Sequence, residues 1–361
     1  MSEHPPPAGA WGSRSASQSP TLADVAREAG VHKATASRAM NPLTRDQVNA
    51  DTFRRILHAA ERLGYVPNTV ARGLRTNRTA AIGVLVPDLT NPLFPPIVRG
   101  ITDRLAADGY TTLLANTDND DEQERAQFAA LESRRADGFI LATARREHRL
   151  LARAAERGVP LVLVNRTVDD LDVPSAVGDD AAGTTQAVAH LAALGHRRIG
   201  HLAGPQDLST GLTRQRAFRH AMDGASLPVP PGAVVTCTGY TEDAGRLACR
   251  RLLDARPDTT AIVAGNDLIA LGALTALAEL GRGCPAEVSV VGFNDMAFVD
   301  KIRPPLTTVH VPHHELGVQA AQLLLERLHD PHAVAKKILL PARLVVRGST
   351  APPATAPSAS P

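Results

Sequence analysis

The stretch TLADVAREAGVHKATASRAMN, residues 21–41, predicts two short helices that cross over a tight turn. Thr21 and Asp24 have the spacing of a capping box, which starts the first helix. Gly30 breaks that helix, and the second helix runs over His32–Met40. Small alanines on both helices allow a close crossing, so this stretch predicts a helix-turn-helix unit.

A third helix completes the predicted head. In NADTFRRILHAAERLGYVPNTVARGL, residues 49–74, apolar side chains recur on one face from about Asp51 to Leu63. Asn49 suits the N-cap, and Gly64 ends the helix. Residues 27–78 contain ten Lys or Arg and four Asp or Glu, although the whole chain is almost balanced at 39 against 37. This local positive charge favours nucleic-acid contact, with a solvated helical surface as the alternative.

The composition is that of a cytoplasmic globular protein. The 361 residues are 43% hydrophobic and 21% charged, and no run reaches the length of a membrane span. Cys237, Cys249 and Cys284 form no C-x-x-C pair, which fits a reducing compartment. The N-terminus lacks the basic start and apolar run of a signal peptide, which argues against a secreted protein.

From residue 80 onward, short apolar runs alternate with helical segments, the pattern of a parallel α/β fold. The predicted strands cover residues 81–86, 111–115, 138–142, 161–164, 199–203, 261–264 and 288–293. The predicted helices cover residues 96–108, 122–135, 181–194, 214–222, 244–253 and 268–280. So many strands favour two doubly wound lobes with a cleft between them. The expected domains are a disordered tail (1–20), a helix-turn-helix head (21–65), a hinge helix and linker (66–79), a body (80–349) and a second disordered tail (350–361). Within the body, we expect lobe one at about 80–179 and 310–337, and lobe two at about 180–309 and 338–349.

Polar residues follow several predicted strands at their carboxyl ends, where open α/β sheets bind ligands. They are Asn91, Asp118, Asn165 and Arg166 in lobe one, together with the aromatic Phe94, and Asn266, Asp267, Asn294 and Asp295 in lobe two. Asp267 and Asp295 also suit helix caps, which is the favoured role for Asp267, and Phe94 suits the core. The amides both donate and accept hydrogen bonds, which fits the hydroxyls of a polyol.

No catalytic motif is present. The sequence contains no G-x-S-x-G, no H-E-x-x-H and no Walker A motif, so we expect neither an enzyme nor a cofactor. His310, His313 and His314 lie close together in the sequence. Because no cysteine or set of carboxylates accompanies them, we expect no metal site there.

The two stretches quoted for the head resemble LacI/GalR-type bacterial transcriptional regulators almost position for position. IGVLVPDLTNPLF, GHRRIGHLAGP, AGNDLIALGAL, SVVGFND and PPLTTV extend the resemblance to about Gly348. It implies a periplasmic-binding-protein-like body behind a DNA-binding head, a homodimer, a roughly palindromic double-stranded DNA operator and a small-molecule effector. In this family the second helix enters the major groove, and the next segment folds as a hinge helix in the minor groove.

The resemblance also implies residue roles in the head. Lys33 and Ala34 occupy base-reading positions beside Arg38, and hydroxyls on the same helix suit phosphates. Leu74 is the wedge that kinks the DNA. His32 stands where the family usually has a serine cap. The implied DNA-contacting residues are Thr21, His32, Lys33, Ala34, Thr35, Ser37, Arg38, Asn41, Asn68, Ala71, Leu74 and Arg75.

In the body, the resemblance makes Arg214 the arginine that holds the effector, makes Tyr240 and Phe94 aromatic platforms, and places His313 at the cleft border. With little carboxylate to offset Arg214, a cationic ligand is disfavoured. We expect a repressor controlled by a sugar or sugar derivative. The alternatives are a purine-responsive regulator of the same family and, in another class, a solute-binding protein without a regulatory role. The candidate effector residues are Asn91, Phe94, Asp118, Asn165, Arg214, Tyr240, Asn266, Asn294 and His313.

Overall fold

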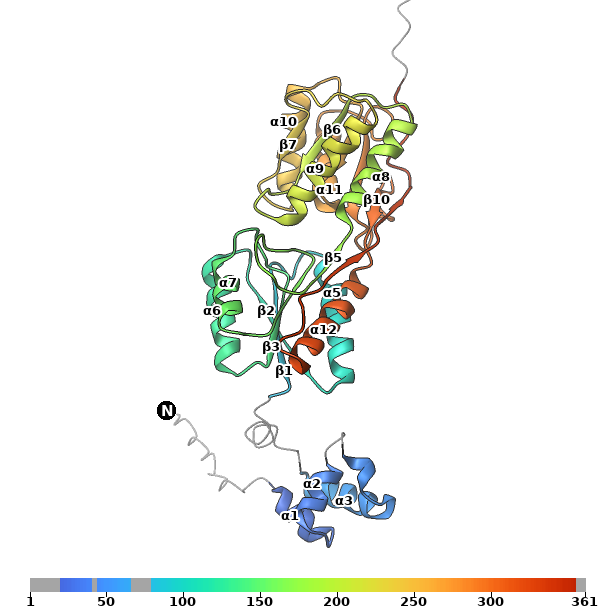
Figure 1. Ribbon diagram of the computed structural model, residues 1–361. Helices are drawn as coiled ribbons and strands as arrows, with labels where there is room; N and C mark the ends of the chain where they lie inside the picture. Colours follow the sequence, from blue (N-terminus) through green and yellow to red (C-terminus); the bar gives the residue numbers. More distant parts are fainter. Residues whose placement is uncertain (1–19, 41–43, 66–78, 355–361) are drawn as a thin grey trace, which may run out of the picture. The chain divides into compact units, whose positions relative to one another are not determined.

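The computed structural model describes residues 20–40, 44–65 and 79–354 (Figure 1). The chain divides into two compact units, Met1–Asn77 and Arg78–Pro361, called the head and the body below. The predicted hinge at 66–79 lies outside the described residues except for Thr79.

The head consists of three helices and a short 3₁₀ turn, namely α1 (Leu22–Glu28), α2 (Lys33–Ala39), η1 (Arg45–Gln47) and α3 (Ala50–Leu63). The predicted capping box of α1 is confirmed, because the Thr21 amide donates to the Asp24 carboxylate at 2.9 Å and the Asp24 amide donates to the Thr21 hydroxyl. Asn49 caps α3 by accepting from the Asp51 amide at 2.9 Å. Gly64 ends α3 in a left-handed conformation with φ of 62°.

One small core holds these helices together. Val25 of α1, Ala36 of α2 and Ile56 of α3 are all completely buried in it. The small alanines allow α1 and α2 to cross closely, as a helix-turn-helix unit requires, so the predicted head is confirmed.

Lobe one of the body is a six-stranded parallel sheet in the order β11-β5-β4-β3-β1-β2. Helices α5 and α12 cover one face and α6 and α7 the other (Figure 1). The elements of this lobe are β1 (Ala81–Val86), α5 (Phe94–Ala107), β2 (Thr111–Asn116), α6 (Asp121–Ser133), β3 (Gly138–Leu141), α7 (Arg149–Glu156), β4 (Leu161–Val164), β5 (Ser175–Gly178), α12 (His313–His329) and β11 (Lys337–Leu340).

Lobe two repeats this plan with the sheet order β12-β10-β9-β8-β6-β7, in which only β12 is antiparallel to its neighbour. Its elements are α8 (Asp180–Ala193), β6 (Ile199–Ala203), α9 (Ser209–Gly224), β7 (Val234–Thr236), α10 (Glu242–Ala255), β8 (Ala261–Ala264), α11 (Asp267–Glu279), β9 (Ser289–Asn294), β10 (Thr307–His310) and β12 (Arg343–Val345). The predicted α/β body of two doubly wound sheets is therefore confirmed.

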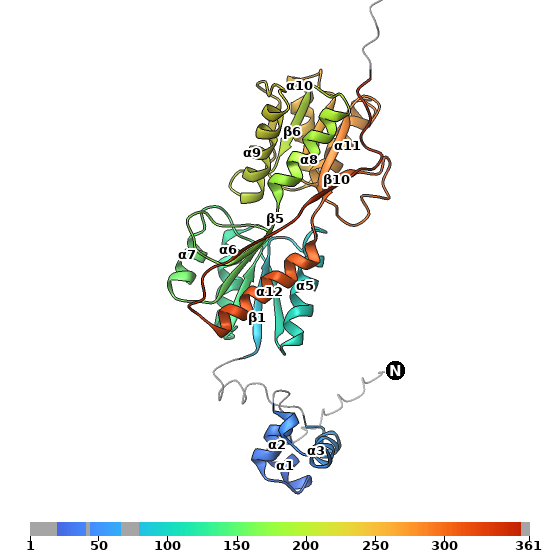
Figure 2. The same ribbon diagram turned by 45° about the vertical axis from the view of Figure 1, so that its right-hand side comes forward.

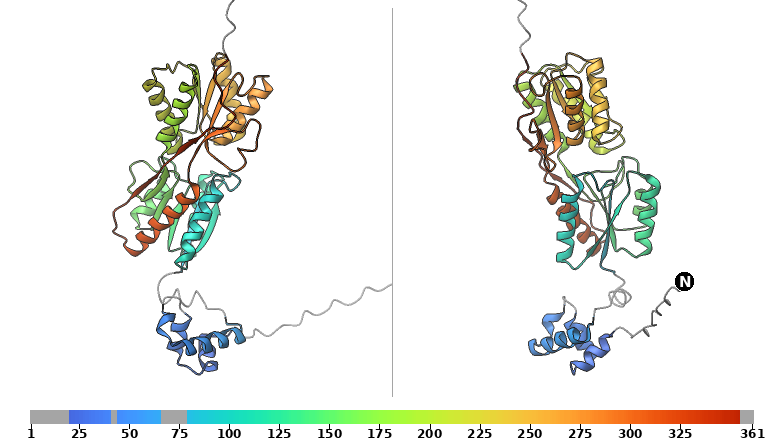
Figure 3. Two further views of the ribbon diagram at one scale, coloured as in Figure 1. Left: turned by 90° about the vertical axis from the view of Figure 1, so that its right-hand side faces the viewer. Right: turned by 180° about the vertical axis from the view of Figure 1, so that it is seen from behind.

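The chain passes between the lobes three times, after β5, after β10 and after β11. As a result α12, from the end of the chain, lies beside α5 in lobe one (Figures 2 and 3). Two lobe boundaries differ from our expectation because strand pairing decides them. His310 ends a strand of lobe two, and residues 338–340 pair with β5 in lobe one.

The segment that begins the expected C-terminal tail is packed against lobe two. The Ala351 amide donates to the Ser289 hydroxyl at 3.0 Å, and the Ala351 carbonyl accepts from His196 Nε2 at 2.8 Å. Thr350 bonds to His190 Nε2 at 3.0 Å. The expectation of a disordered tail from residue 350 is thus wrong for residues 350–354.

Glycines lie where helices pack most closely. A Cβ on Gly272 of α11 would overlap the carbonyl oxygen of Glu242 at the start of α10. In lobe one, a Cβ on Gly100 of α5 would overlap the carbonyl oxygen of His314 on α12. Both lobes therefore rely on backbone-to-backbone contact between a helix pair that has no room for a side chain.

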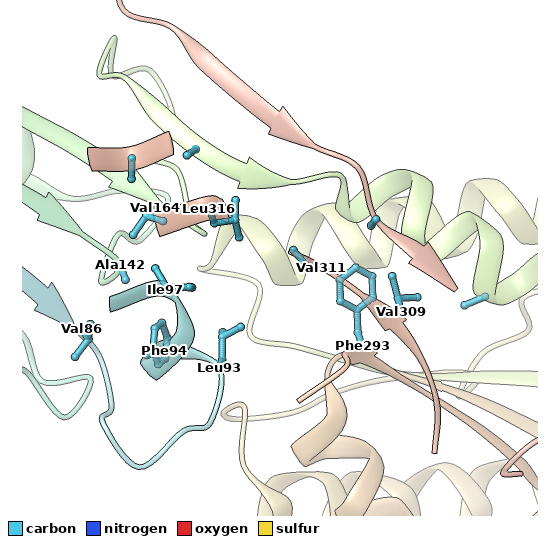
Figure 4. Packing of buried hydrophobic residues seen from close by; sticks show 14 of the residues in the cluster. Val86, Leu93, Phe94, Ile97, Ala142, Val164, Phe293, Val309, Val311 and Leu316 are labelled. Carbon is cyan, nitrogen blue, oxygen red and sulfur yellow. The ribbon is translucent and has the colours of Figure 1, made fainter. Parts of the chain in front are cut away.

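The largest buried cluster runs through both lobes. It includes Phe94 and Leu316 in lobe one and Phe293 and Val309 in lobe two. Figure 4 shows Val311 on the segment that leads from Val309 back towards Leu316. In the described parts of the chain, no helix has the length and apolarity needed to cross a membrane.

Candidate functional site

A small cavity lies between the carboxyl ends of the two sheets. Lobe one contributes residues that follow β1 and β4, and lobe two contributes residues that follow β6, β7, β8 and β9. The lining residues are Asn91, Leu93, Phe94, Asn165, Arg166, Thr210, Arg214, Tyr240, Asn266 and Asn294.

Arg214 of α9 is the most strongly held side chain of the cleft. Its Nη2 and Nε donate to Asp180 Oδ1 at 2.8 and 3.1 Å, and its Nη1 donates to the Gly265 carbonyl at 2.6 Å. Its guanidinium also stacks on the Phe293 ring, with Cζ 3.7 Å from the ring centroid. The expectation that Arg214 meets little carboxylate is therefore wrong, because Asp180 at the start of α8 neutralises it.

The amides of the cleft fall into two groups. The side-chain oxygens of Asn91 and Asn266 accept hydrogen bonds from nearby backbone amides. Asn91 accepts from the Leu93 amide at 3.0 Å, and Asn266 caps α11 by accepting from the Ile269 amide at 2.8 Å. Asn165 and Asn294 have left-handed backbones, with φ of 67° and 114°, which asparagine tolerates better than most residues. Their side-chain amides bond to no described residue and so remain open to a ligand.

The aromatic candidates differ in exposure. Phe94 is 1% exposed and belongs to the main core while also lining the cleft. Tyr240 bonds to the Thr210 hydroxyl at 2.9 Å, and its burial raises the pKa of the phenol. Its ring occupies the space over Gly204, where a Cβ would overlap it. Tyr240 thus offers both an apolar face and a polar atom to the cavity.

Two predicted effector residues do not line the cavity. Asp118 is exposed beyond the end of the edge strand β2. His313, the first residue of α12, is 8% exposed, and burial together with nearby His310 lowers the pKa of its imidazole to about 3. Its Nε2 has no partner in the part of the chain that the structure describes. Three lining residues were absent from the predicted effector set: Leu93, Arg166 and Thr210.

The lobes are bonded to each other beside the cavity. Arg145 of lobe one pairs with Asp207 of lobe two at 2.7 Å, and the Arg146 amide donates to the Asp207 carbonyl at 2.8 Å. The Thr167 amide donates to the Ser209 hydroxyl at 2.9 Å. The cavity is therefore held between lobes that are joined by direct polar contacts.

A buried carboxyl group, that of Asp267, directly follows the lining residue Asn266 in the chain. Asp267 is fully buried, and it accepts from the Met296 amide at 2.8 Å and from the Thr308 hydroxyl at 2.5 Å. It does not cap α11, since Asn266 does, so the favoured capping role is wrong. Asp295 is no helix cap either, because the next described helix, α12, begins only at His313, and Asp295 instead pairs with Arg347 at 2.6 Å.

Burial raises the pKa of Asp267 to about 7, above its ordinary value of 3.8. The folded state therefore holds this proton more tightly than the unfolded chain, and the stability it contributes at low pH is lost as the pH rises from about 4 to about 7. We expect Asp267→Asn to weaken the fall in melting temperature between pH 5 and pH 8. Asp243→Asn, at an exposed position on α10, is the matched control. An unchanged pH dependence in Asp267→Asn would contradict this assignment.

The head presents a basic surface on α2. Lys33, Ala34 and Arg38 are exposed, and neither cation forms an ion pair with a described residue. Thr35 and Ser37 are half-buried. By contrast, several other basic side chains of the head are neutralised within it, in the pairs Arg27–Asp24, Arg54–Asp51 and Arg62–Glu28.

The remaining DNA-contact candidates divide into two groups. Thr21 is committed to its capping box, and the His32 side chain caps α2 by accepting from the Ala34 amide at 3.3 Å. Five lie outside the described residues: Asn41, Asn68, Ala71, Leu74 and Arg75. All the DNA contacts remain predictions.

Two family models match the chain. One, described as bacterial regulatory proteins of the lacI family, matches residues 21–68. The other, described as periplasmic binding proteins and sugar binding domain of the LacI family, matches residues 79–347. The division between the two matches falls in the segment that joins the head to the body.

Individual relatives match over almost the whole chain. The HTH-type transcriptional repressor CytR of Escherichia coli strain K12 is 32% identical over 331 residues, covering 91% of this chain and 96% of that protein. The structure of a transcriptional regulator CelR–cellobiose complex has a TM-score of 0.71 at 33% identity, covering 91% and 99%. The lac repressor dimer bound to operator and the anti-inducer ONPF has a TM-score of 0.79 at 27% identity, covering 92% and 100%.

Proposed function

Because this chain belongs to the LacI family of bacterial regulatory proteins, we propose that it is a sequence-specific DNA-binding repressor whose activity is set by a sugar or sugar derivative. The observation that carries this function is the presence, in one chain, of a helix-turn-helix head with free cations on α2 and a cleft lined with polar side chains. The structure of a relative bound to operator DNA supports the DNA-binding role, and that of a relative bound to cellobiose supports a sugar effector. A solute-binding protein without a regulatory role leaves the head unexplained.

The protein acts as a homodimer on a roughly palindromic operator, as the dimeric lac repressor on its operator suggests. In each half-site α2 lies in the major groove, where Lys33 donates to guanine O6 or N7 and Arg38 neutralises phosphate. Two heads read two half-sites, so the symmetry of the dimer sets the symmetry of the DNA site.

The effector acts through the lobes. The chain enters the body at Thr79, whose amide donates to Asp137 at 2.8 Å, and the Ala80 amide donates to the same carboxylate at 2.8 Å. This entry point is therefore fixed to lobe one. Because the ligand contacts both lobes, its binding changes their relative position, and lobe one carries the chain that leads to the head.

Lys33→Ala tests base reading. We expect a loss of operator affinity of about 1–3 kcal/mol and a relaxed preference at one base pair per half-site, because Lys33 supplies a donor to a base edge. The measurement is the affinity for an operator selected from random DNA and for unrelated DNA of equal length. Lys301→Ala, an exposed lysine of the body, is the control. An equal loss on both DNAs would mean that Lys33 contacts only phosphates.

A further inference from the structure

One cation in the cleft lacks a counter-charge. Arg166 follows β4, lines the cavity and is only 6% exposed. Its guanidinium makes no hydrogen bond or ion pair with any residue that the structure describes, and its buried Nε has no partner at all. Arg214, the other arginine of the lining, is already bonded to Asp180 and Gly265.

The carboxylates nearest to Arg166 do not form an ion pair with it. Asp207 acts on Arg166 only through space, because it bonds to Arg145 at 2.7 Å. Glu124 likewise bonds to His148 at 3.2 Å. The other polar side chains of the lining are amides, a hydroxyl and a phenol. No described residue is therefore bonded to Arg166 to balance its positive charge in the cavity.

This charge persists at neutral pH. Burial lowers the pKa of Arg166, but only to about 10. A buried cation without a partner is unfavourable, and the planar guanidinium fork matches a carboxylate or phosphate in a bidentate arrangement. An anionic ligand would thus gain more in this cavity than a neutral ligand of the same shape.

We propose, on the basis of the proposed function, that the effector is an anionic polyol whose carboxylate or phosphate pairs with Arg166. The open amides of Asn165 and Asn294 then bond its hydroxyls, and Tyr240 covers its apolar face. The guanidinium of Arg166 can bind a carboxylate or a phosphate in the same way. The experiment therefore has to distinguish a sugar acid from a sugar phosphate.

The test measures binding to the full-length protein by calorimetry, with matched ligands at fixed ionic strength. Glucose, gluconate, glucuronate and glucose 6-phosphate form one series, and ribose and ribose 5-phosphate form a second. We expect one anionic member to bind at least about tenfold more tightly than its neutral counterpart. Tighter binding of the sugar acids would identify the anionic group as a carboxylate, and tighter binding of the sugar phosphates would identify it as a phosphate. Inorganic phosphate is the minimal probe, and it should raise the melting temperature relative to chloride.

Three variants locate the effect. Arg166→Gln should abolish both the anion preference and the stabilisation by phosphate, while its ligand-free melting temperature is unchanged or higher, because a buried unpaired charge is removed. Asn165→Asp places a carboxylate next to Arg166 at a backbone conformation that aspartate also tolerates, and should weaken anion binding at least about tenfold. Arg149→Gln, at an exposed arginine of lobe one, controls for overall charge.

The proposal is overturned if the neutral sugars bind as tightly as their anionic partners, or if neither phosphate nor any anionic sugar stabilises the wild-type protein. It is also overturned if Arg166→Gln keeps the anion preference. Operator binding by the same preparations tests the proposed function separately. A neutral sugar that changes operator affinity would uphold the repressor and refute the anionic effector, whereas loss of specific operator binding would refute the repressor.

Discussion

Arg214→Ala should abolish the response of operator binding to the effector and destabilise the body by roughly 3–5 kcal/mol. The substitution leaves the Asp180 carboxylate buried without its partner, and it removes the bond to the Gly265 carbonyl and the stacking on Phe293. Operator affinity without effector should remain close to that of the parent, because the head is a separate unit. Calorimetric unfolding and operator binding with and without ligand measure the two effects.

A double variant separates the loss of stability from the loss of ligand binding. Asp180→Asn combined with Arg214→Met removes both charges of the pair and should recover much of the stability, because no unpaired charge remains buried. It should not recover the ligand response, since the cleft still lacks the guanidinium. An Arg214→Ala protein with normal stability, or with a normal response, would contradict the role given to this pair.

Gly272→Ala is the second substitution with a large expected effect. The new Cβ would overlap the Glu242 carbonyl oxygen, so α10 and α11 would have to separate. We expect a loss of stability beyond the roughly 1–3 kcal/mol of an overpacked core, because two backbones must move rather than one side chain. Since Asn266 caps α11 and lines the cleft, ligand affinity should fall as well.

Gly224→Ala is the matched control for this prediction. Gly224 is the last residue of α9, and a Cβ there has no atom within 4 Å. Alanine is the better helix former by about 1 kcal/mol, so this variant should be neutral or slightly stabilised. Thermal unfolding of the two variants compares them directly. Equal melting temperatures would show that the helix pair tolerates a methyl group at the crossing.

Six interior strands, namely β1, β3, β4, β6, β8 and β9, could be predicted because buried parallel strands consist of continuous apolar residues. The sequence pattern missed the interior strands β5 and β10, which are short and contain Ser, Gly, Thr or His among their apolar residues. It also missed β7, β11 and β12, which are edge strands of three or four partly exposed residues. It also missed the pairing of β11 with β5, which joins segments about 160 residues apart. Such pairing depends on the assembled lobe rather than on local composition.

The residues of the cleft could also be predicted only in part. The asparagines were found because each follows a buried strand, and the carboxyl ends of parallel strands meet at one edge. The same rule failed for Asp118, because β2 is at the edge of its sheet and the residue is turned to solvent. The pair of Asp180 with Arg214 connects the first residue of α8 with a residue inside α9, 34 residues further along the chain, and no local sequence pattern predicts it. Only the folded geometry showed that Arg166 lacks a partner.

The three passages of the chain between the lobes have a consequence for synthesis on the ribosome. Lobe one needs α12 against α5 and β11 against β5, and both are synthesised after most of lobe two. At about 5–20 residues per second, the emerging β5 edge waits on the order of ten seconds or more for its neighbour. The head and most of lobe two fold from contiguous sequence and need not wait. Chains that terminate before residue 337 would therefore keep an exposed sheet edge in lobe one, a substrate for chaperones and proteases.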